Sequence, residues 1–294
     1  MEAVTSASTR ASKSPSRGSG SPLREDSDWK YSMQKTPCPY NTRLLKGGAL
    51  LDDMRLLVRR WSDEAAGPQG ETIVAENLLG KNTRSRAFDT YRSVFRPRFV
   101  EGDPPNAWKL LRLLEERELS VETLRPIYYW VTARHERILH DFVVDELVPR
   151  SRSHDRIVRT DEVAVWITSR FAKYDRSLSP TVTRRLAQGV LSTLRDFGIL
   201  EGAVKKRIAP TYLPIEAFAY LAFAIHAQGV SGQALVGHRD WALFLLQGAV
   251  VENQFLEADR SNLLSYQAAG GIVRVDFAAH TFEEMADVVA RRSH

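Results

Sequence analysis

The sequence predicts a mainly α-helical fold, a helical bundle with one or two short β-hairpins. After residue 36, apolar residues recur at three- and four-residue steps along most of the chain, and Gly- or Pro-containing breaks separate these periodic segments. Short extended runs are limited to residues 199–208 and 272–277, where we expect the strands. The longest apolar run, residues 217–225, is about half of the ~20 residues that span a bilayer, so we expect no membrane partner.

Composition narrows the class of protein and its compartment. The chain has 294 residues, of which 43% are hydrophobic, and its formal net charge is +5 with a pI near 9.3. This is enough apolar material for one large or two ordinary domains, and the basic balance is compatible with a nucleic-acid partner without requiring one. The single cysteine, Cys38, excludes an internal disulfide framework and favours a reducing compartment. We therefore expect a cytoplasmic protein.

Three regions of the chain differ in composition and pattern. Residues 1–36 are rich in Ser, Gly, Pro and Arg and lack apolar periodicity, which is typical of a disordered leader. Residues 37–150 predict an N-terminal helical domain, and residues 151–294 predict a C-terminal domain. We place the boundary in the basic, weakly patterned stretch at 150–160.

The N-terminal domain should consist of helices. We expect them over about residues 50–61, 71–78, 83–99 and 106–117, with a longer helix from Ser120 that stops at Pro149. Thr83 and Ser120 are residue types that cap helix N-termini, and Gly80 is typical of a helix end.

Lys81, Arg84 and Arg86 lie at the start of the helix expected from Thr83. Backbone N–H groups and the helix dipole favour an anion at such a position, so these three residues are candidate phosphate contacts. Further cationic clusters fall at 150–159, 170–185 and 205–207. The alternative interpretation is that each cluster is an ordinary solvated face.

The C-terminal domain carries the clearest pattern. We expect a helix over 161–173, a turn over 174–178, and a second helix from Ser179 and Pro180 to Gly198. One side of this second helix is apolar. Its opposite side gathers the polar residues Arg184, Arg185, Gln188, Ser192 and Arg195.

A basic hairpin should follow that helix, with Lys205, Lys206 and Arg207 in its turn and second strand. Helix, turn, basic-faced helix and basic hairpin is the order of a winged helix-turn-helix, in which the second helix enters the major groove and the wing follows the DNA backbone. We therefore expect a winged-helix-like module over about residues 161–213. The alternative is an ordinary helical hairpin capped by a strand pair.

The remaining residues should be mostly helical. We expect helices over 215–226, 241–251 and 256–268, a strand over 272–277, and a final helix over 282–289. This part could form a second, degenerate winged unit, but Arg274 is its one well-placed cation. We interpret it first as packing surface.

The motifs that would indicate catalysis are missing from the sequence. It contains no GxxxxGK[ST] or GxSxG segment, and no GxGxxG between a strand and a helix. His135 and His140 are five residues apart, so on a helix their side chains diverge by ~140° and do not share a metal ion. We expect no catalytic residues, no metal site and no cofactor.

Several segments together resemble the BrxA family, a small component of BREX bacteriophage-exclusion systems. The similarity covers about residues 40–255 and depends on YNTRLLKGGALLDDMRLL, AENLLGKNTRSRAFDTYRSVFRPRF, RHERILHDFVVDELV, and LSPTVTRRLAQGVLSTLRDFGIL followed by IAPTYLP. The resemblance implies an all-helical, winged-helix-like protein without catalytic activity. It also implies binding to double-stranded DNA beside the methyltransferase, ATPase and phosphatase-like members of the system.

Two functions from different classes remain open at this point. The first is double-stranded DNA binding by Lys81, Arg84, Arg86, Arg184, Arg185, Gln188, Arg195, Lys205, Lys206 and Arg207. The second is a structural adaptor that docks another defence subunit through Trp241, Phe244, Leu245 and Phe255. RNA binding is a third hypothesis, but the sequence offers no exposed aromatic platform for it.

Overall fold

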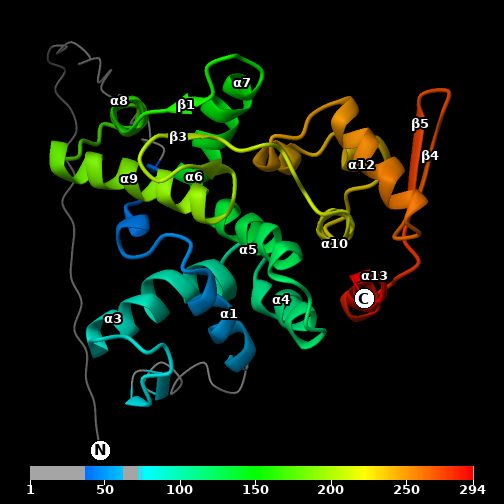
Figure 1. The fold of residues 1–294 in the computed structure, drawn as a ribbon, viewed down its shortest axis with the longest axis horizontal. Coiled ribbons are helices and arrows are strands. Elements are labelled where there is room, and N and C mark those ends of the chain that lie inside the picture. The colour runs from blue at the N-terminus through cyan, green and yellow to red at the C-terminus, as the bar shows by residue number, and fades with distance from the viewer. Residues whose placement is uncertain (1–36, 62–71, 74, 294) are drawn as a thin grey trace, which may run out of the picture. The chain divides into compact units, whose positions relative to one another are not determined.

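Most of the first helices follow the predicted periodic segments, but residues 76–79 form a turn, so the helix predicted over 71–78 was wrong at its C-terminal end. The computed structural model describes residues 37–61, 72–73 and 75–293, and the predicted leader lies outside these described residues. After the 3₁₀ turn η1 (Arg43–Leu45) come α1 (Leu51–Arg60), α3 (Arg84–Asp89), the π-helical η3 (Thr90–Val100) and α4 (Ala107–Glu116) (Figure 1). Thr83 caps α3 as predicted, because its hydroxyl accepts a hydrogen bond from the Arg86 backbone N–H at 3.2 Å.

The long helix predicted from Ser120 to Pro149 is interrupted, so that prediction was wrong in its extent. Ser120 does cap α5 (Val121–His135), but the helix breaks at Glu136, where ψ is 82°. The chain then forms α6 (Arg137–Phe142), the π-helical η4 (Val143–Leu147) and α7 (Val148–Ser151). The carboxylate of Glu136 is buried against Arg98, a contact 38 positions away along the chain that helical periodicity does not encode.

The middle of the chain forms a helix pair with a small sheet. The order is β1 (Ile157–Val158), α8 (Thr160–Ala172), α9 (Pro180–Asp196), β2 (Leu200–Glu201) and β3 (Lys206–Ile208). The three strands are antiparallel in the order β1-β3-β2, with Ile157 opposite Arg207 and Glu201 opposite Arg207 on its other side. The helices and the hairpin match the prediction. The two-residue strand β1 was missed, since it is too short to show a pattern.

The C-terminal part differs most from the prediction. It contains α10 (Ile215–His226), α11 (Gly232–Val236), the 3₁₀ helix η5 (Arg239–Phe244), α12 (Ala249–Arg260), β4 (Ser265–Ala269), β5 (Ile272–Asp276) and α13 (Phe282–Ser293). The helices predicted over 241–251 and 256–268 were therefore wrong. Left-handed backbone at Leu245 ends η5 before α12 begins. Residues 265–269 pair with β5 across a Gly270–Gly271 turn in which both φ angles are positive.

Apolar side chains from both predicted domains contribute to one core. Trp130 of α5 donates a hydrogen bond from its indole N–H to Asp240 at 2.8 Å, and Tyr129 of α5 packs edge-on against Phe244 of η5. The described residues from Pro37 onward belong to one compact unit by their contacts, and the domain boundary at 150–160 stays a prediction. Within the described residues, every helix is too short or too polar to cross a bilayer.

Candidate nucleic-acid interface

One face of α9 is buried and the other exposes cations. Thr183, Leu186, Ala187, Val190, Leu191 and Leu194 are buried, as the apolar stripe requires. Arg184, Arg185, Gln188 and Arg195 are all exposed, and they spread over about 100° of the opposite face at 100° per residue. The predicted polar face of this helix is thus a solvent-accessible surface.

The charges on this face differ in how far the protein itself neutralises them. Arg195 forms an ion pair with its neighbour Asp196, with 2.6 Å between Nη2 and Oδ1. Arg184 and Arg185 have no ion pair or side-chain hydrogen bond within the described residues. Most buried or half-buried arginines in the described part of the chain, such as Arg98 and Arg134, are paired with a carboxylate. No carboxylate of the described residues therefore offsets Arg184 or Arg185, which leaves their charge available to an external anion.

The hairpin beside α9 carries the next cations. Lys205 is exposed in its turn, and the ammonium group of Lys206 donates to the Ala203 carbonyl at 3.1 Å. Arg207 on β3 forms an ion pair with Glu201 on β2. Gly202 opens the turn with φ of +91°, where a side chain would clash with the backbone carbonyl of Lys205. Of the three predicted wing cations, Lys205 is the most available to a ligand.

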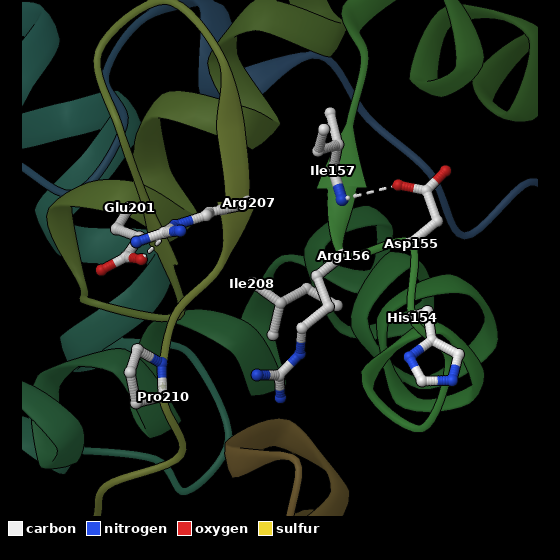
Figure 2. A pocket seen from close by; sticks show the side chains of 8 residues that line it. All are labelled: His154, Asp155, Arg156, Ile157, Glu201, Arg207, Ile208 and Pro210. Carbon is white, nitrogen blue, oxygen red and sulfur yellow. Dashed lines mark hydrogen bonds and ion pairs between the residues drawn. The ribbon is translucent and has the colours of Figure 1, made fainter.

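A cavity of about 410 Å³ lies beside this sheet and contains a cation that the prediction overlooked. Figure 2 shows the Arg156 side chain directed into it between Ile208 and His154. Asp155 faces away from this guanidinium and accepts a hydrogen bond from the Ile157 backbone N–H at 3.1 Å. Arg156 belongs to the basic stretch that the sequence marked as a domain boundary, and β1 converts this stretch into part of the sheet.

The N-terminal cations have separate environments. Lys81 forms an ion pair with Asp53 at 2.7 Å, and Arg86 donates to the Lys46 carbonyl at 2.7 Å. Arg84 is exposed at the first residue of α3. Arg98, in the same basic cluster of the sequence, is fully buried. The prediction that the three residues contact phosphate stays a prediction, and Lys81 would first have to leave Asp53.

A short segment connects these cations to α9. Leu44 of η1 is buried, and its backbone carbonyl lies 3.5 Å from the position that a Cβ on Gly189 would occupy. Two residues later, Lys46 accepts the hydrogen bond from Arg86. A Cβ at position 189 would lie in ordinary van der Waals contact with Leu44, so η1 packs directly against α9 at this point. Residues 44–46 therefore contact both the first turn of α3, through Arg86, and α9, through Gly189.

His135 and His140 have partners other than a metal ion. His135 Nε2 lies 3.0 Å from a guanidinium nitrogen of Arg43, and His140 Nδ1 lies 2.9 Å from Asp141. Burial lowers the pKa of His135, which keeps its ring neutral at neutral pH. No group of three metal-ligating side chains occurs within the described part of the chain.

The anchors expected for an adaptor are in the core. Trp241, Phe244 and Phe255 are at most 5% exposed, and Leu245 is half-buried. The indole N–H of Trp241 donates to the Leu235 carbonyl at 2.8 Å, and its ring also contacts Phe255 edge-on. These side chains pack against the protein itself, so the idea that they form a docking surface was wrong.

The similarity to known proteins covers the part of the chain that contains these features. No curated protein matches the sequence. Residues 38–224 match the model of the BrxA family, a range that includes η1, α3, α8, α9 and the β2–β3 hairpin and exceeds half of the chain. The chain therefore belongs to the BrxA family.

Proposed function

We propose that this protein is a non-enzymatic, double-stranded DNA-binding subunit of a BREX-type bacteriophage defence system. The observation that carries the proposal is the exposed face of α9, where Arg184 and Arg185 have no internal counter-charge within the described residues. Two adjacent unneutralised guanidinium groups on a rigid helix suit a phosphate backbone or the acceptor edge of guanine.

The order of elements around α9 supports the same function. The order β1, α8, α9 and the β2–β3 hairpin, with the strand order β1-β3-β2, supports a winged helix-turn-helix as the proposed DNA-binding module. In that arrangement α9 is the helix that enters the major groove, and the hairpin is the wing. Lys205 would then contact the DNA backbone, and Lys206 and Arg207 would follow it along β3.

The predicted residues would have different roles in DNA binding. Arg184 and Arg185 would contact phosphates or guanine, while Gln188, near the middle of the exposed face, would reach base edges. Arg195, offset by Asp196, would contribute less. Lys81, Arg84 and Arg86 would form a second, auxiliary phosphate contact.

Family membership supports a place beside the other BREX components, the methyltransferase, ATPase or phosphatase-like subunits. The adaptor hypothesis has less support, because its three aromatic anchors Trp241, Phe244 and Phe255 are buried and Leu245 is half-buried. A protein of this kind would bring DNA to the enzymes of the system. The protein itself would bind DNA and would not catalyse a reaction.

Competition between nucleic acids tests the proposal directly. A fluorescein-labelled 20-base-pair DNA duplex is bound by the protein and challenged with unlabelled duplex DNA, duplex RNA or single-stranded RNA of the same sequence. We expect duplex DNA to compete best, because A-form RNA hides its major groove from a helix. Equal or better competition by RNA would overturn the proposal.

A further inference from the structure

A second concave basic surface lies between η1 and η3. Its cavity has a volume of about 390 Å³, and its polar lining consists of Thr42, Arg43, Lys46, Arg92 and Ser93. Three of these side chains are cationic and two carry hydroxyl groups, while no carboxylate lines the cavity among the described residues. Cations with hydroxyl donors in one concavity form a donor set for an oxyanion.

Arg43 lines this cavity, and its guanidinium group has a neutral hydrogen-bond partner. Its Nη1 atom lies 3.0 Å from His135 Nε2. A guanidinium group has no acceptor, so the histidine nitrogen must accept, and the ring is neutral with its proton on Nδ1. Burial lowers the pKa of His135 and favours that neutral form. A neutral partner fixes one edge of the guanidinium and leaves its remaining N–H groups and its full charge available.

Arg92 contributes a second available charge. Its guanidinium lies over the Phe88 ring at 5.6 Å from the centroid, and it has no carboxylate partner within the described residues. Lys46 is partly offset by Asp89, with 3.1 Å between Nζ and Oδ2. Among the described residues, the three cations Arg43, Lys46 and Arg92 are therefore offset by one carboxylate, that of Asp89, and the net charge at the cavity is positive.

The location of the cavity connects it to α9. Residues 42–46 form one of its walls, and Leu44 within this segment packs against Gly189 of α9. Gly48 follows, with no room for a Cβ beside Thr193 of the same helix. The wall of the cavity is thus fixed to the helix that exposes Arg184 and Arg185.

We propose that the cavity between η1 and η3 binds a backbone phosphate of the same DNA duplex that contacts α9, a proposal that rests on the proposed function. Arg43 and Arg92 supply the charge-assisted hydrogen bonds, Lys46 adds a third cation, and the hydroxyl groups of Thr42 and Ser93 complete the donor set. Contacts of this kind position the protein on the duplex and carry no sequence information.

The test compares single charge removals at matched exposed arginines. Affinity for the 20-base-pair duplex is measured by fluorescence anisotropy from 50 to 200 mM KCl for the wild type, Arg92→Gln, Arg43→Gln, Arg92→Lys and Arg260→Gln. Arg260 is an exposed arginine on α12, with one long ion pair to the exposed Glu257 at 3.9 Å, and serves as the control for loss of one positive charge elsewhere. Melting temperatures confirm that each variant is folded, and Arg92 is the primary site because it makes no internal ion pair within the described residues.

We expect Arg92→Gln to weaken binding by roughly threefold to tenfold and to make the slope of log affinity against log salt shallower by about 0.9, equally for unrelated duplex sequences. Arg43→Gln should act in the same direction, while Arg92→Lys and Arg260→Gln stay within twofold of the wild type. If Arg92→Gln and Arg43→Gln match Arg260→Gln while Arg184→Gln/Arg185→Gln weakens binding, the phosphate site is overturned and the proposed function stands. If the wild type does not bind, both are overturned.

Discussion

Arg98 and Glu136 form an ion pair in which both side chains are fully buried, with 3.0 Å between the guanidinium Nε and the carboxylate Oε1. The remaining guanidinium N–H groups donate to the carbonyls of Gly47 and Gly48 at 2.9 and 2.7 Å. The pair therefore joins η3, the break between α5 and α6, and the segment that leads from η1 to α1. That segment also packs against α9, where Gly48 lies beside Thr193. The buried ion pair therefore helps to fix the position of α9, the helix of the candidate interface.

Replacement of Arg98 by methionine should be strongly destabilising. It leaves the Glu136 carboxylate buried without its counter-charge, and we expect a loss of about 3–5 kcal/mol in the free energy of unfolding. Urea unfolding followed by circular dichroism measures this loss. The double variant Arg98→Met/Glu136→Leu should regain much of it, since neither charge then remains buried. If the free energy of unfolding of Arg98→Met is within about 1 kcal/mol of the wild-type value, the ion pair does not stabilise this arrangement.

Glu115 should give the protein an acid-sensitive component of stability. Burial alone would raise its pKa, but hydrogen bonds from Arg55 and Arg59 bring the pKa below its ordinary value of 4.5. A carboxyl group with a lowered folded-state pKa stabilises the protein above the unfolded-state pKa, and this contribution is lost as pH falls through the folded-state pKa.

Glu115→Gln should therefore cost about 2 kcal/mol at pH 7 and progressively less below pH 4.5. Urea unfolding at pH 7, 5 and 4 gives the free energy of unfolding of the wild type and of Glu115→Gln at each pH. The exposed residue Glu257 provides the control substitution Glu257→Gln. A constant difference between wild type and Glu115→Gln across this range would refute the assignment.

Trp241→Ala should act on folding. The side chain is 2% exposed and stacks on Phe218, so its removal leaves a cavity and should cost about 3–5 kcal/mol. Thermal unfolding measures the loss, with the exposed Val250→Ala on α12 as the control. A variant with wild-type stability that no longer copurifies with another defence subunit would instead restore Trp241 as a docking residue.

Removal of Glu201 should strengthen DNA binding. Its carboxylate neutralises Arg207 across the hairpin, and Glu201→Gln would release that guanidinium for a phosphate. We expect a roughly twofold to threefold gain in duplex affinity at low salt, consistent with the ~0.5 kcal/mol of an exposed ion pair. Asp276→Gln, which releases Arg274 on the other hairpin, is the matched control and should change little. Equal gains from both variants would indicate a general effect of charge.

The sequence predicted those parts of the fold that local pattern determines. Apolar periodicity and the caps at Thr83, Ser120 and Ser179 located α3, α5 and α9, and the exposed face of α9 followed from its period of 3.6 residues. Features that depend on distant partners were not predictable in this way. The break at Glu136 depends on Arg98, and β4 depends on β5 across a glycine turn.

The candidate site shows the same division. Which cations lie on one helix face was predictable, whereas their neutralisation was not. Lys81 appeared available in the sequence, but Asp53, 28 positions earlier, pairs with it. Arg43 and Arg92 were missed because the segment at 42–46 and η3 meet only in the folded chain. A single sequence without its tertiary contacts cannot distinguish a free charge from a paired one.

Salt-dependent binding of the 20-base-pair duplex, measured by fluorescence anisotropy for the wild type and for Arg184→Gln/Arg185→Gln, tests the central claim most directly. If about six phosphates are contacted, the wild type should give a log-log slope near −5, and loss of the two arginines should make it shallower by roughly 2 and weaken binding. The unchanged melting temperature of the double variant would show that it is folded. Absence of wild-type binding at 50 mM salt, or identical slopes for the two proteins, would contradict DNA recognition by α9.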